Sequence, residues 1–497
     1  MWLSRKDYHR VGSAMQEFHK LLTRFINEKN TTIYTLAKNT GIERSYIQKM
    51  KSGARIPGEK STILKLAKGL MLTANESAQL VQAYSIAKMG EGKYYQRMFV
   101  QNIISSFAEV QAKNTLILEC NTQNNLVMCN DYEHISGVSA VHKVLRAVME
   151  IEASKEDGCI RIIAQPSFSY IYDCISTLNS STNVENIITL YKQDNDNTIN
   201  YNLDVFQKLV PLFFSCPHFH PFYVHDHVDT IFNDTTVLPV TIITSDYLLR
   251  IANDCKQALL IRDEKIRQLY LASFDKKKLN SKPIFDTISA EPEQYFANTA
   301  ALMDFDGEAN YNIMYQPCII PYIPSDTVNA CINTDVLTSA MLSQINEYLY
   351  NLSTCRNTFQ MVFTEEGLDM FLRTGKIVEI PHFMLRANPT KKQRLEIIAN
   401  FIAAMEEGRA VAHIAKPNLF TIPKPIVITA YSKQQVIIHH FDESGSIHIF
   451  RLEEISLVNA FHDFLMWIQD CDLVYTQEES LEILQNVYKK HFNNVYR

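Results

Sequence analysis

The sequence predicts an all-helical head followed by a large α/β (mixed α+β) body whose pattern suggests two similar lobes. Helical periodicity fills about the first 90 residues. Beyond them, buried strand-like runs alternate with amphipathic helices, as in layered α/β proteins. The charge balance changes between the same two parts. Residues 1–100 contain 17 Lys and Arg against 7 Asp and Glu, whereas residues 101–497 contain 31 against 47. A basic head on an acidic body favours a polyanionic partner for the head alone.

Composition narrows the protein class. The chain has 497 residues, 46% of them apolar, which is enough for several buried cores. No apolar run approaches the roughly 18 residues of a membrane span, and the first residues lack a signal peptide's apolar segment. Ten cysteines are scattered without a CxxC pair, which is typical of reduced thiols. We therefore expect a soluble cytoplasmic protein that has no membrane partner.

The head begins with a predicted helix over residues 12–28. Its apolar residues recur at helical spacing, with Phe18, Leu22 and Phe25 on one face. Thr31 or Thr32 then caps a second helix, because a hydroxyl can accept a hydrogen bond from the free amides of a first turn. These features indicate a small helical core.

A glycine turn joins the second predicted helix to a third. Gly41 is expected at positive φ, where a side chain would be strained. Ile42 fills the corner, while Ile47 and Met50 anchor the third helix from beneath. Two short helices joined by such a turn have the layout of a helix-turn-helix, whose second helix lies in the DNA major groove. Double-stranded DNA is therefore the expected partner.

The outward positions of the third helix are the candidate DNA contacts. Arg44, Ser45 and Gln48 lie in the part that reaches base edges, where Arg pairs with guanine and Gln with adenine. The remaining candidates are assigned to phosphates and sugars, which set position rather than sequence. The full set is Thr32, Arg44, Ser45, Tyr46, Gln48, Lys49, Lys51 and Arg55.

The head resembles the helix-turn-helix family of lambda repressor and Cro, the XRE type. The matching residues, in order and with the family's spacing, are Leu36-Ala37, Gly41-Ile42, Ser45, Ile47 and the segment 51–57. The resemblance covers about residues 14–87 and implies a fourth helix near 63–70 and a fifth over 74–87. It departs from the family at Ile33, where a bracing Gln is usual, and at Glu43, where a Ser or Thr cap is usual.

The domain boundaries follow composition and pattern. We predict a helix-turn-helix domain over 1–88, a linker over 89–99 and an α/β lobe over 100–290. A mainly helical connector over 291–354 and a second α/β lobe over 355–497 complete the chain. The linker is predicted because Gly90 and Gly92 are two of only 14 glycines.

Within the body, the pattern predicts alternating helices and strands. Pro211 is expected to stop a short helix over 203–210. The other predicted elements of the first lobe are a helix over 141–153, a strand over 159–164, a helix over 167–178 and a strand over 185–191.

A weak internal repeat suggests that the lobes are related. The segment 163–166 echoes 414–417, and 238–244 echoes 424–429, each followed by a strand-like run and a helix. Two such lobes faintly resemble the phospholipase D architecture, which needs an HxKxxxxD motif in each lobe. No H-x-K triplet occurs in this chain, so that chemistry is not supported.

One cluster of histidines is the candidate metal site. His218, His220, His225 and His227 lie within ten residues, and imidazoles two apart on a strand share a face. The competing interpretation, a polar strand beside a turn, is favoured because the adjacent prolines indicate irregular backbone. No GxGxxG, GxxxxGK[ST], HExxH or GxSxG motif occurs, so no cofactor and no enzymatic activity are expected.

The sequence thus predicts a sequence-specific DNA-binding transcriptional regulator. Its body would sense a signal, such as a small molecule or peptide, or mediate oligomerisation, since a short recognition helix needs a dimer for useful affinity. Two alternatives remain open. One is a DNA-targeted enzyme, a nuclease or metal-dependent hydrolase using the histidines, and the other is a protein-interaction scaffold with a degenerate head.

Overall fold

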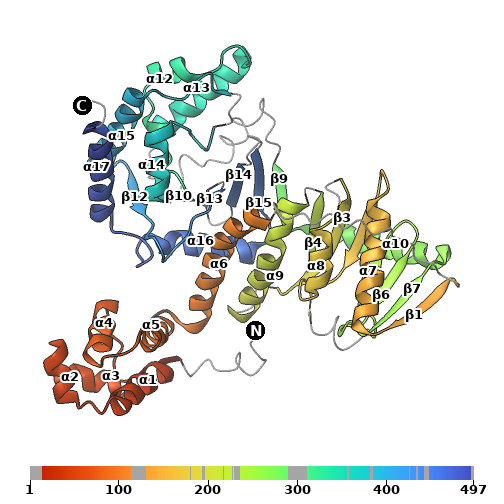
Figure 1. The fold of residues 1–497 in the computed structure, drawn as a ribbon, viewed down its shortest axis with the longest axis horizontal. Helices are drawn as coiled ribbons and strands as arrows, with labels where there is room; N and C mark the ends of the chain where they lie inside the picture. The colour runs from red at the N-terminus through yellow and green to blue at the C-terminus, as the bar shows by residue number, and fades with distance from the viewer. Residues whose placement is uncertain are drawn as a thin grey trace. The chain divides into compact units, whose positions relative to one another are not determined.

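The described part of the chain forms two compact units. The computed structural model describes residues 14–113, 130–178, 181–192, 196–216, 218–226, 228, 236–288, 310–354, 359–380, 384–424, 426–432, 435–441 and 447–493. One unit comprises residues 1–99 with 194–200, and the other comprises 100–193 with 201–497. We call them the head and the body (Figure 1). Within these ranges, none of the helices has both the length and the apolar run that crossing a bilayer would need.

The head is helical, as predicted. Its elements are α1 (Ala14–Glu28), α2 (Ile33–Thr40), α3 (Arg44–Lys51), α4 (Lys60–Gly69), α5 (Ala74–Met89) and the start of α6 (Glu91–Lys113). The apolar faces of α1–α5 share one core, built around Phe18, Leu22, Phe25, Leu36, Ile47, Met50, Ile63, Leu66, Leu80 and Tyr84. The periodicity that predicted these helices is therefore the periodicity of their buried face.

The predicted linker over 89–99 is helical in the structure. Gly90, at φ +87°, ends α5, and α6 begins one residue later at Glu91. Gly92 lies inside α6. A glycine at positive φ ends a helix, but the residues that follow include good helix formers, so the chain starts a new helix at once. The boundary between head and body falls within α6, after Phe99.

The first lobe of the body (residues 130–283) is built on a sheet of eight strands. Its elements are β1 (Tyr132–Ser136), α7 (Val138–Ala153), β2 (Cys159–Ile163), α8 (Ser169–Ile175), β3 (Asn183–Leu190), α9 (Asp196–Ser215), β4 (Phe219–His225), β5 (Val240–Ile243), β6 (Leu248–Ile251), β7 (Gln257–Ile261), α10 (Glu264–Leu279) and β8 (Lys282–Pro283). The order across the sheet is β1-β7-β6-β5-β2-β3-β4-β8. Both faces bury apolar side chains, for example Ile162 on one and Ile187 beneath α10 on the other.

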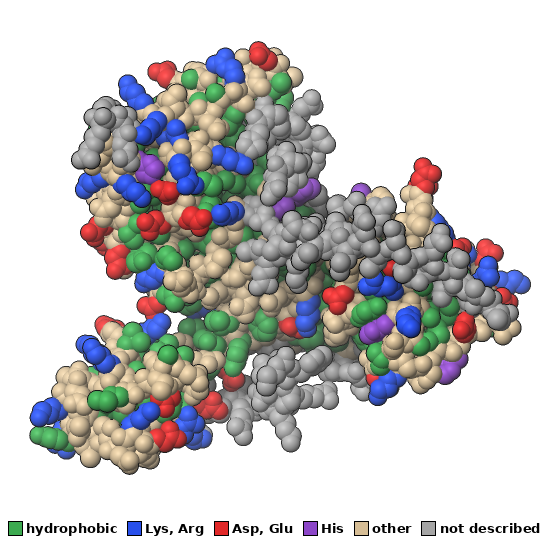
Figure 2. Space-filling view, in the orientation of Figure 1, with side chains coloured by type: hydrophobic (Ala, Val, Ile, Leu, Met, Phe, Trp, Pro, Cys, Tyr) green, Lys and Arg blue, Asp and Glu red, His purple; other side chains and the backbone are tan. Residues whose placement is uncertain are grey.

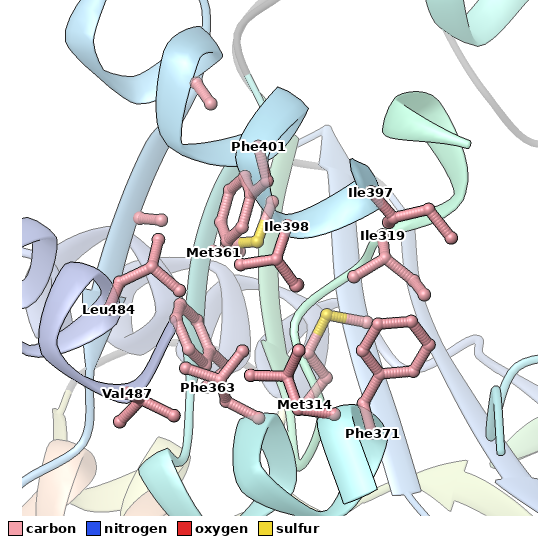
Figure 3. Close-up of a cluster of buried hydrophobic side chains, with 14 of the residues drawn as sticks. Met314, Ile319, Met361, Phe363, Phe371, Ile397, Ile398, Phe401, Leu484 and Val487 are labelled. Carbon is pink, nitrogen blue, oxygen red and sulfur yellow. The ribbon is translucent and has the colours of Figure 1, made fainter. Parts of the chain in front are cut away.

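The second lobe (residues 285–493) has a sheet of seven strands in the order β12-β11-β10-β13-β14-β15-β9. Its elements are β9 (Phe285–Ile288), β10 (Asn310–Met314), η2 (Ile320–Tyr322), α12 (Ser325–Cys331), α13 (Ser339–Thr354), β11 (Phe359–Phe363), α14 (Glu365–Thr374), α15 (Lys391–Glu406), β12 (Val411–Ile414), β13 (Ile426–Ser432), β14 (Gln435–Phe441), β15 (Ile447–Leu452), α16 (Ile455–Ile468) and α17 (Gln477–Asn493). Figure 3 shows the core between this sheet and its helices, which includes Phe363, Phe371 and Phe401.

The two sheets have the same topology. Read from the other edge, the second sheet runs β9-β15-β14-β13-β10-β11-β12, which matches β1-β7-β6-β5-β2-β3-β4 strand for strand. In each, three strands are parallel and the other pairings are antiparallel. Even β8 has a counterpart, an antiparallel bridge between Ala415 and Val474 beside β12. The α/β body with two similar lobes is therefore confirmed.

The topology corrects one of the two pairs of similar segments that the sequence suggested. The segment 163–166 follows β2, whose counterpart is β10, so its partner is 314–317 rather than 414–417. The correct pair shares a Gln-Pro dipeptide, Gln165-Pro166 and Gln316-Pro317. The second proposed similarity is correct, because 238–244 contains all of β5 and 424–429 contains most of its counterpart β13.

Several predicted boundaries also differ. The second sheet takes its first strands, β9 and β10, from residues before 355, so the segment 291–354 contributes a central strand as well as helices. Helix α9 runs from Asp196 to Ser215 with Pro211 inside it, rather than stopping there. Leu209, Val210 and Leu212 are all at least 98% buried, and this packing outweighs the hydrogen bond that proline cannot donate.

Candidate nucleic-acid interface

The turn between α2 and α3 has the predicted geometry. The Thr32 hydroxyl caps α2 by accepting a hydrogen bond from the Thr35 amide at 3.1 Å. At the other end Gly41 has φ +70° and ψ +10°, and its amide donates to the Ala37 carbonyl at 2.9 Å. Of the two possible caps Thr32 is the one used, and the positive φ at Gly41 is confirmed.

The underside of α3 is anchored in the head core. Ile47 and Met50 are 0% exposed, and Ile42 packs half-buried at the turn, as the spacing predicted. Gly69 of α4 faces α2 so closely that a β-carbon there would lie 2.4 Å from Thr40 Cγ2. This close approach supports α2 from behind and fixes the corner that presents α3.

The outer face of α3 carries the predicted contact residues. Arg44, Ser45, Gln48 and Lys49 are exposed. Tyr46 differs from expectation, because it is half-buried and packs against the head core. Of the other candidates, Thr32 and Arg55 are exposed and Lys51 is half-buried.

Two arginines lie over tyrosine rings beside α3. The guanidinium carbon of Arg44 is 5.3 Å from the ring centre of Tyr34, and that of Arg55 is 4.9 Å from the ring centre of Tyr46. Cation–π contacts of this kind orient a planar guanidinium while leaving its N–H edge free to donate. The sequence reasoning missed Tyr34, whose signal was a large aromatic residue at the exposed second position of α2.

The start of α3 has an acidic residue in the cap position. Glu43 makes no cap hydrogen bond to the helix amides, and its carboxylate instead accepts the Ser45 hydroxyl at 2.5 Å. This contact occupies the one proton that Ser45 can donate. A carboxylate at a helix N-terminus interacts favourably with the helix dipole, although it opposes an incoming phosphate.

Other contacts hold the helices that carry this surface. Lys29, directly after α1, donates to the Glu76 carboxylate at 2.9 Å, and Glu76 also completes a capping box with Thr73. The Lys29 hydrogen bond and the Thr73 amide lower the pKa of Glu76 to about 2. The carboxylate therefore stays ionised, and α5 stays tied to α1, through the whole physiological range.

The head surface is basic in the structure as in the sequence. Residues 14–90 contain 12 Lys and Arg against 5 Glu, and Figure 2 shows blue side chains spread over the exposed head face. The exposed cations include Lys20, Arg24, Lys38, Arg44, Lys49, Arg55, Lys65, Lys68 and Lys88.

The histidine cluster does not assemble into a metal site among the residues that the structure describes, which hold no suitable group of three His, Cys, Asp or Glu. His220 lies on β4 opposite Glu185, and His218 is exposed just before that strand. His225, at the end of β4, contacts the fully buried Glu454 at 3.2 Å instead. His227 lies outside the described residues.

Comparisons with known proteins give only weak likenesses. No protein-family model matches the chain, and no curated protein matches it. Among solved structures it is similar to TrmBL2, an archaeal chromatin protein with a novel mode of DNA binding. The identity is 11% over 42% of this chain and 70% of that one, with a TM-score of 0.21. It is also similar to the phosphatidylserine synthase of Haemophilus influenzae Rd KW20. The identity is 10% over 78% of this chain and 97% of that one, with a TM-score of 0.23. At these TM-scores no functional property of either protein transfers to this chain.

Proposed function

We propose that this protein is a cytoplasmic, sequence-specific DNA-binding transcriptional regulator with an XRE-type head. The observation that carries the proposal is that α3 has one buried apolar face and one exposed polar face. Ile47 and Met50 are fully buried, whereas Arg44, Gln48 and Lys49 are exposed on the opposite face of the same helix. A helix anchored from beneath and polar above is what major-groove recognition requires.

Each candidate contact residue has a role in this proposal. Arg44, oriented by Tyr34, donates two hydrogen bonds to guanine, and Gln48 pairs with adenine. Ser45 takes a smaller part, because Glu43 already accepts its hydroxyl proton. The phosphate and sugar contacts fall to Thr32, Tyr46, Lys49, Lys51 and Arg55.

A dimer follows from the size of the head. One short helix reads only a few base pairs, so two heads on a two-part operator are needed for specific affinity. In this proposal the body provides the contact between copies and receives a small-molecule or peptide effector. A signal bound there alters DNA affinity through a coupling free energy between the two sites.

The test is selection of bound fragments from random DNA by the full-length protein at near-physiological salt. We expect an enriched motif with two halves, whose spacing reports the distance between the two heads. If no sequence is enriched and binding disappears as salt rises, the head is a nonspecific anchor and the proposal is wrong.

A further inference from the structure

An apolar pocket opens in the second lobe, between two of its connecting segments. One wall comes from the connection between β10 and β11, through Ile320, Val328, Cys331 and Ile345. The other comes from the segment between α14 and α15, which contributes Ile377 and Met384. The cavity has a volume of about 60 Å³ for the centres of water-sized spheres, which is several times the roughly 10–15 Å³ that one water molecule needs on the same measure.

The lining of the pocket determines what it can hold. Among the described residues that line the pocket, Thr327 alone has a hydroxyl, amide or charged side chain, and the rest are aliphatic apart from Cys331 and Met384. A charged group buried among these described residues would meet no counter-charge, which is very unfavourable. An uncharged aliphatic group would exchange water for apolar contacts on every side.

The duplicated fold shows that these walls are additions. Among the described residues, α8 is the one helix between β2 and β3 of the first lobe, whereas η2, α12 and α13 lie between their counterparts β10 and β11. Likewise α9 is the one helix that the structure describes between β3 and β4, whereas both α14 and α15 lie between β11 and β12. The first lobe forms the same strand order without these additions, so the sheet does not require them.

Backbone hydrogen bonds link the two walls and fix them relative to each other. The Asn333 amide donates to the Met384 carbonyl at 2.9 Å, and the Arg386 amide donates to the Cys331 carbonyl at 2.8 Å. Between them, Ile332 and Leu385 form an antiparallel bridge. A frame fixed in this way limits collapse of the walls onto each other, so the cavity is part of the fold.

From these observations we propose that the pocket is a binding site for a small uncharged aliphatic molecule, or for an alkyl chain of one. This goes beyond the proposed function, which leaves the effector site unlocated. Only the further step, that this ligand changes DNA affinity, rests on the proposed function.

The test is calorimetric titration of the full-length protein with straight-chain alcohols from butanol to decanol, without DNA. We expect saturable binding, with affinity rising about fourfold per methylene until the chain fills the pocket, and a negative heat-capacity change. Octanoate should bind at least tenfold more weakly than octanol. Absence of saturable binding, or equal binding of octanoate and octanol, overturns the proposal.

Matched variants locate the site. Val328→Phe places a ring in the pocket and should weaken octanol binding at least tenfold, whereas Asn329→Phe adds the same ring at an exposed neighbour and should not. Leu349→Phe fills the pocket from α13 and provides a second variant should the first fail to fold. Unchanged binding in whichever filling variant folds overturns the proposal.

A parallel DNA titration with and without octanol keeps the two proposals separate. If octanol binds but the affinity for DNA does not change, the ligand is not an effector of DNA binding, and the proposed pocket site still stands. Loss of all specific DNA binding would contradict the proposed function without affecting the calorimetric result.

Discussion

At the scale of single residues, Arg44 and Gln48 make the sharpest prediction. Both side chains are exposed on α3, and neither belongs to the head core. Replacing both by alanine should therefore leave the fold intact while erasing sequence preference. The loss should be about 1–3 kcal/mol of discrimination for each base contact removed. Binding of the variant to its selected operator and to a scrambled duplex measures this difference.

Lys49→Ala is the matched control on the same exposed face. It should weaken binding to both duplexes equally and reduce the salt dependence, because phosphate contacts carry no sequence information. Should Arg44→Ala with Gln48→Ala instead unfold the head, our assignment of the two faces of α3 is wrong.

A half-buried glutamate and a buried histidine give the stability of the second lobe opposing responses to pH. Burial raises the pKa of Glu379 from 4.5 to about 7, and burial lowers the pKa of His439 from 6.5 to about 4. For Glu379, the folded state holds a proton that the unfolded chain releases between pH 4.5 and 7. The contribution of Glu379 to the free energy of unfolding therefore falls as pH rises. For His439, the unfolded chain takes up a proton between pH 6.5 and 4, so this stability falls as pH drops.

Because the two pH ranges overlap, the effect of each residue on the stability of the body partly cancels the effect of the other. Glu379→Gln should stabilise the body above pH 7 by up to about 3 kcal/mol, and His439→Phe should stabilise it near pH 4 by a similar amount. Urea unfolding of the full chain at pH 4.5 and 7.5 separates the effects. Variants with the pH dependence of the wild type would show that neither group is desolvated as described.

Which residues were predictable depended on the range of their interactions. Gly41, Ile47 and Met50 were assigned correctly because their roles follow from spacing within some fifteen residues. Tyr34 and Glu454 were missed because their partners, Arg44 and His225, come from other elements. Burial of Tyr46 also depends on how α3 packs on the rest of the head, which the helix pattern alone does not fix.

At the scale of elements, the turn before α3 depends on the backbone of Gly41. A β-carbon there meets nothing within 4 Å, so the cost of alanine comes from its φ of +70° alone. We expect Gly41→Ala to destabilise the helix pair by about 1 kcal/mol. Amide hydrogen exchange of α2 and α3 in the full-length protein should then accelerate about fivefold.

Gly58→Ala is the control for this prediction. Gly58 is equally open but has no positive φ, so exchange in α2 and α3 should stay at the wild-type rate. Equal exchange in both variants would mean that the turn tolerates a side chain at Gly41.

Element boundaries were less predictable where packing overrides local preference. Local preferences predict that Pro211 ends a helix. In the structure α9 continues past Pro211, because the apolar side chains on both sides of it are buried. The repeat was recognised, yet one echo was paired with the wrong strand, since a strand followed by proline is too short a pattern to specify its neighbours. Strand order is set by contacts between distant residues, which a single sequence does not reveal.

At the scale of the whole body, the lobes are joined through a buried carboxylate. Glu454 is 0% exposed, caps α16 through the Leu457 amide and contacts His225 of the first lobe. Asn202 of the first lobe also donates to Ser456 at 3.1 Å. Glu454→Ala should lower the free energy of unfolding of the body by about 3 kcal/mol, because it leaves several buried groups without partners.

The first lobe provides a control for the Glu454 prediction. Asp263 occupies the same position before α10 and caps that helix through the Ile266 amide, but its other partner is the exposed Tyr132. Asp263→Ala should therefore cost much less than Glu454→Ala when the two variants are unfolded in urea under the same conditions. A larger loss at Asp263 would show that Glu454 does not join the lobes.

The shared strand order also has a consequence for synthesis of the chain. In each lobe the edge strand that is made first pairs with the third strand of the later antiparallel run (β5-β6-β7 or β13-β14-β15), so β1 pairs with β7 and β9 with β15. Residues 132–136 must therefore wait for 257–261, and 285–288 for 447–452. On the ribosome each lobe remains an open sheet with an unpaired edge until its final hairpin emerges, so that is when nascent chains are most exposed to misassociation.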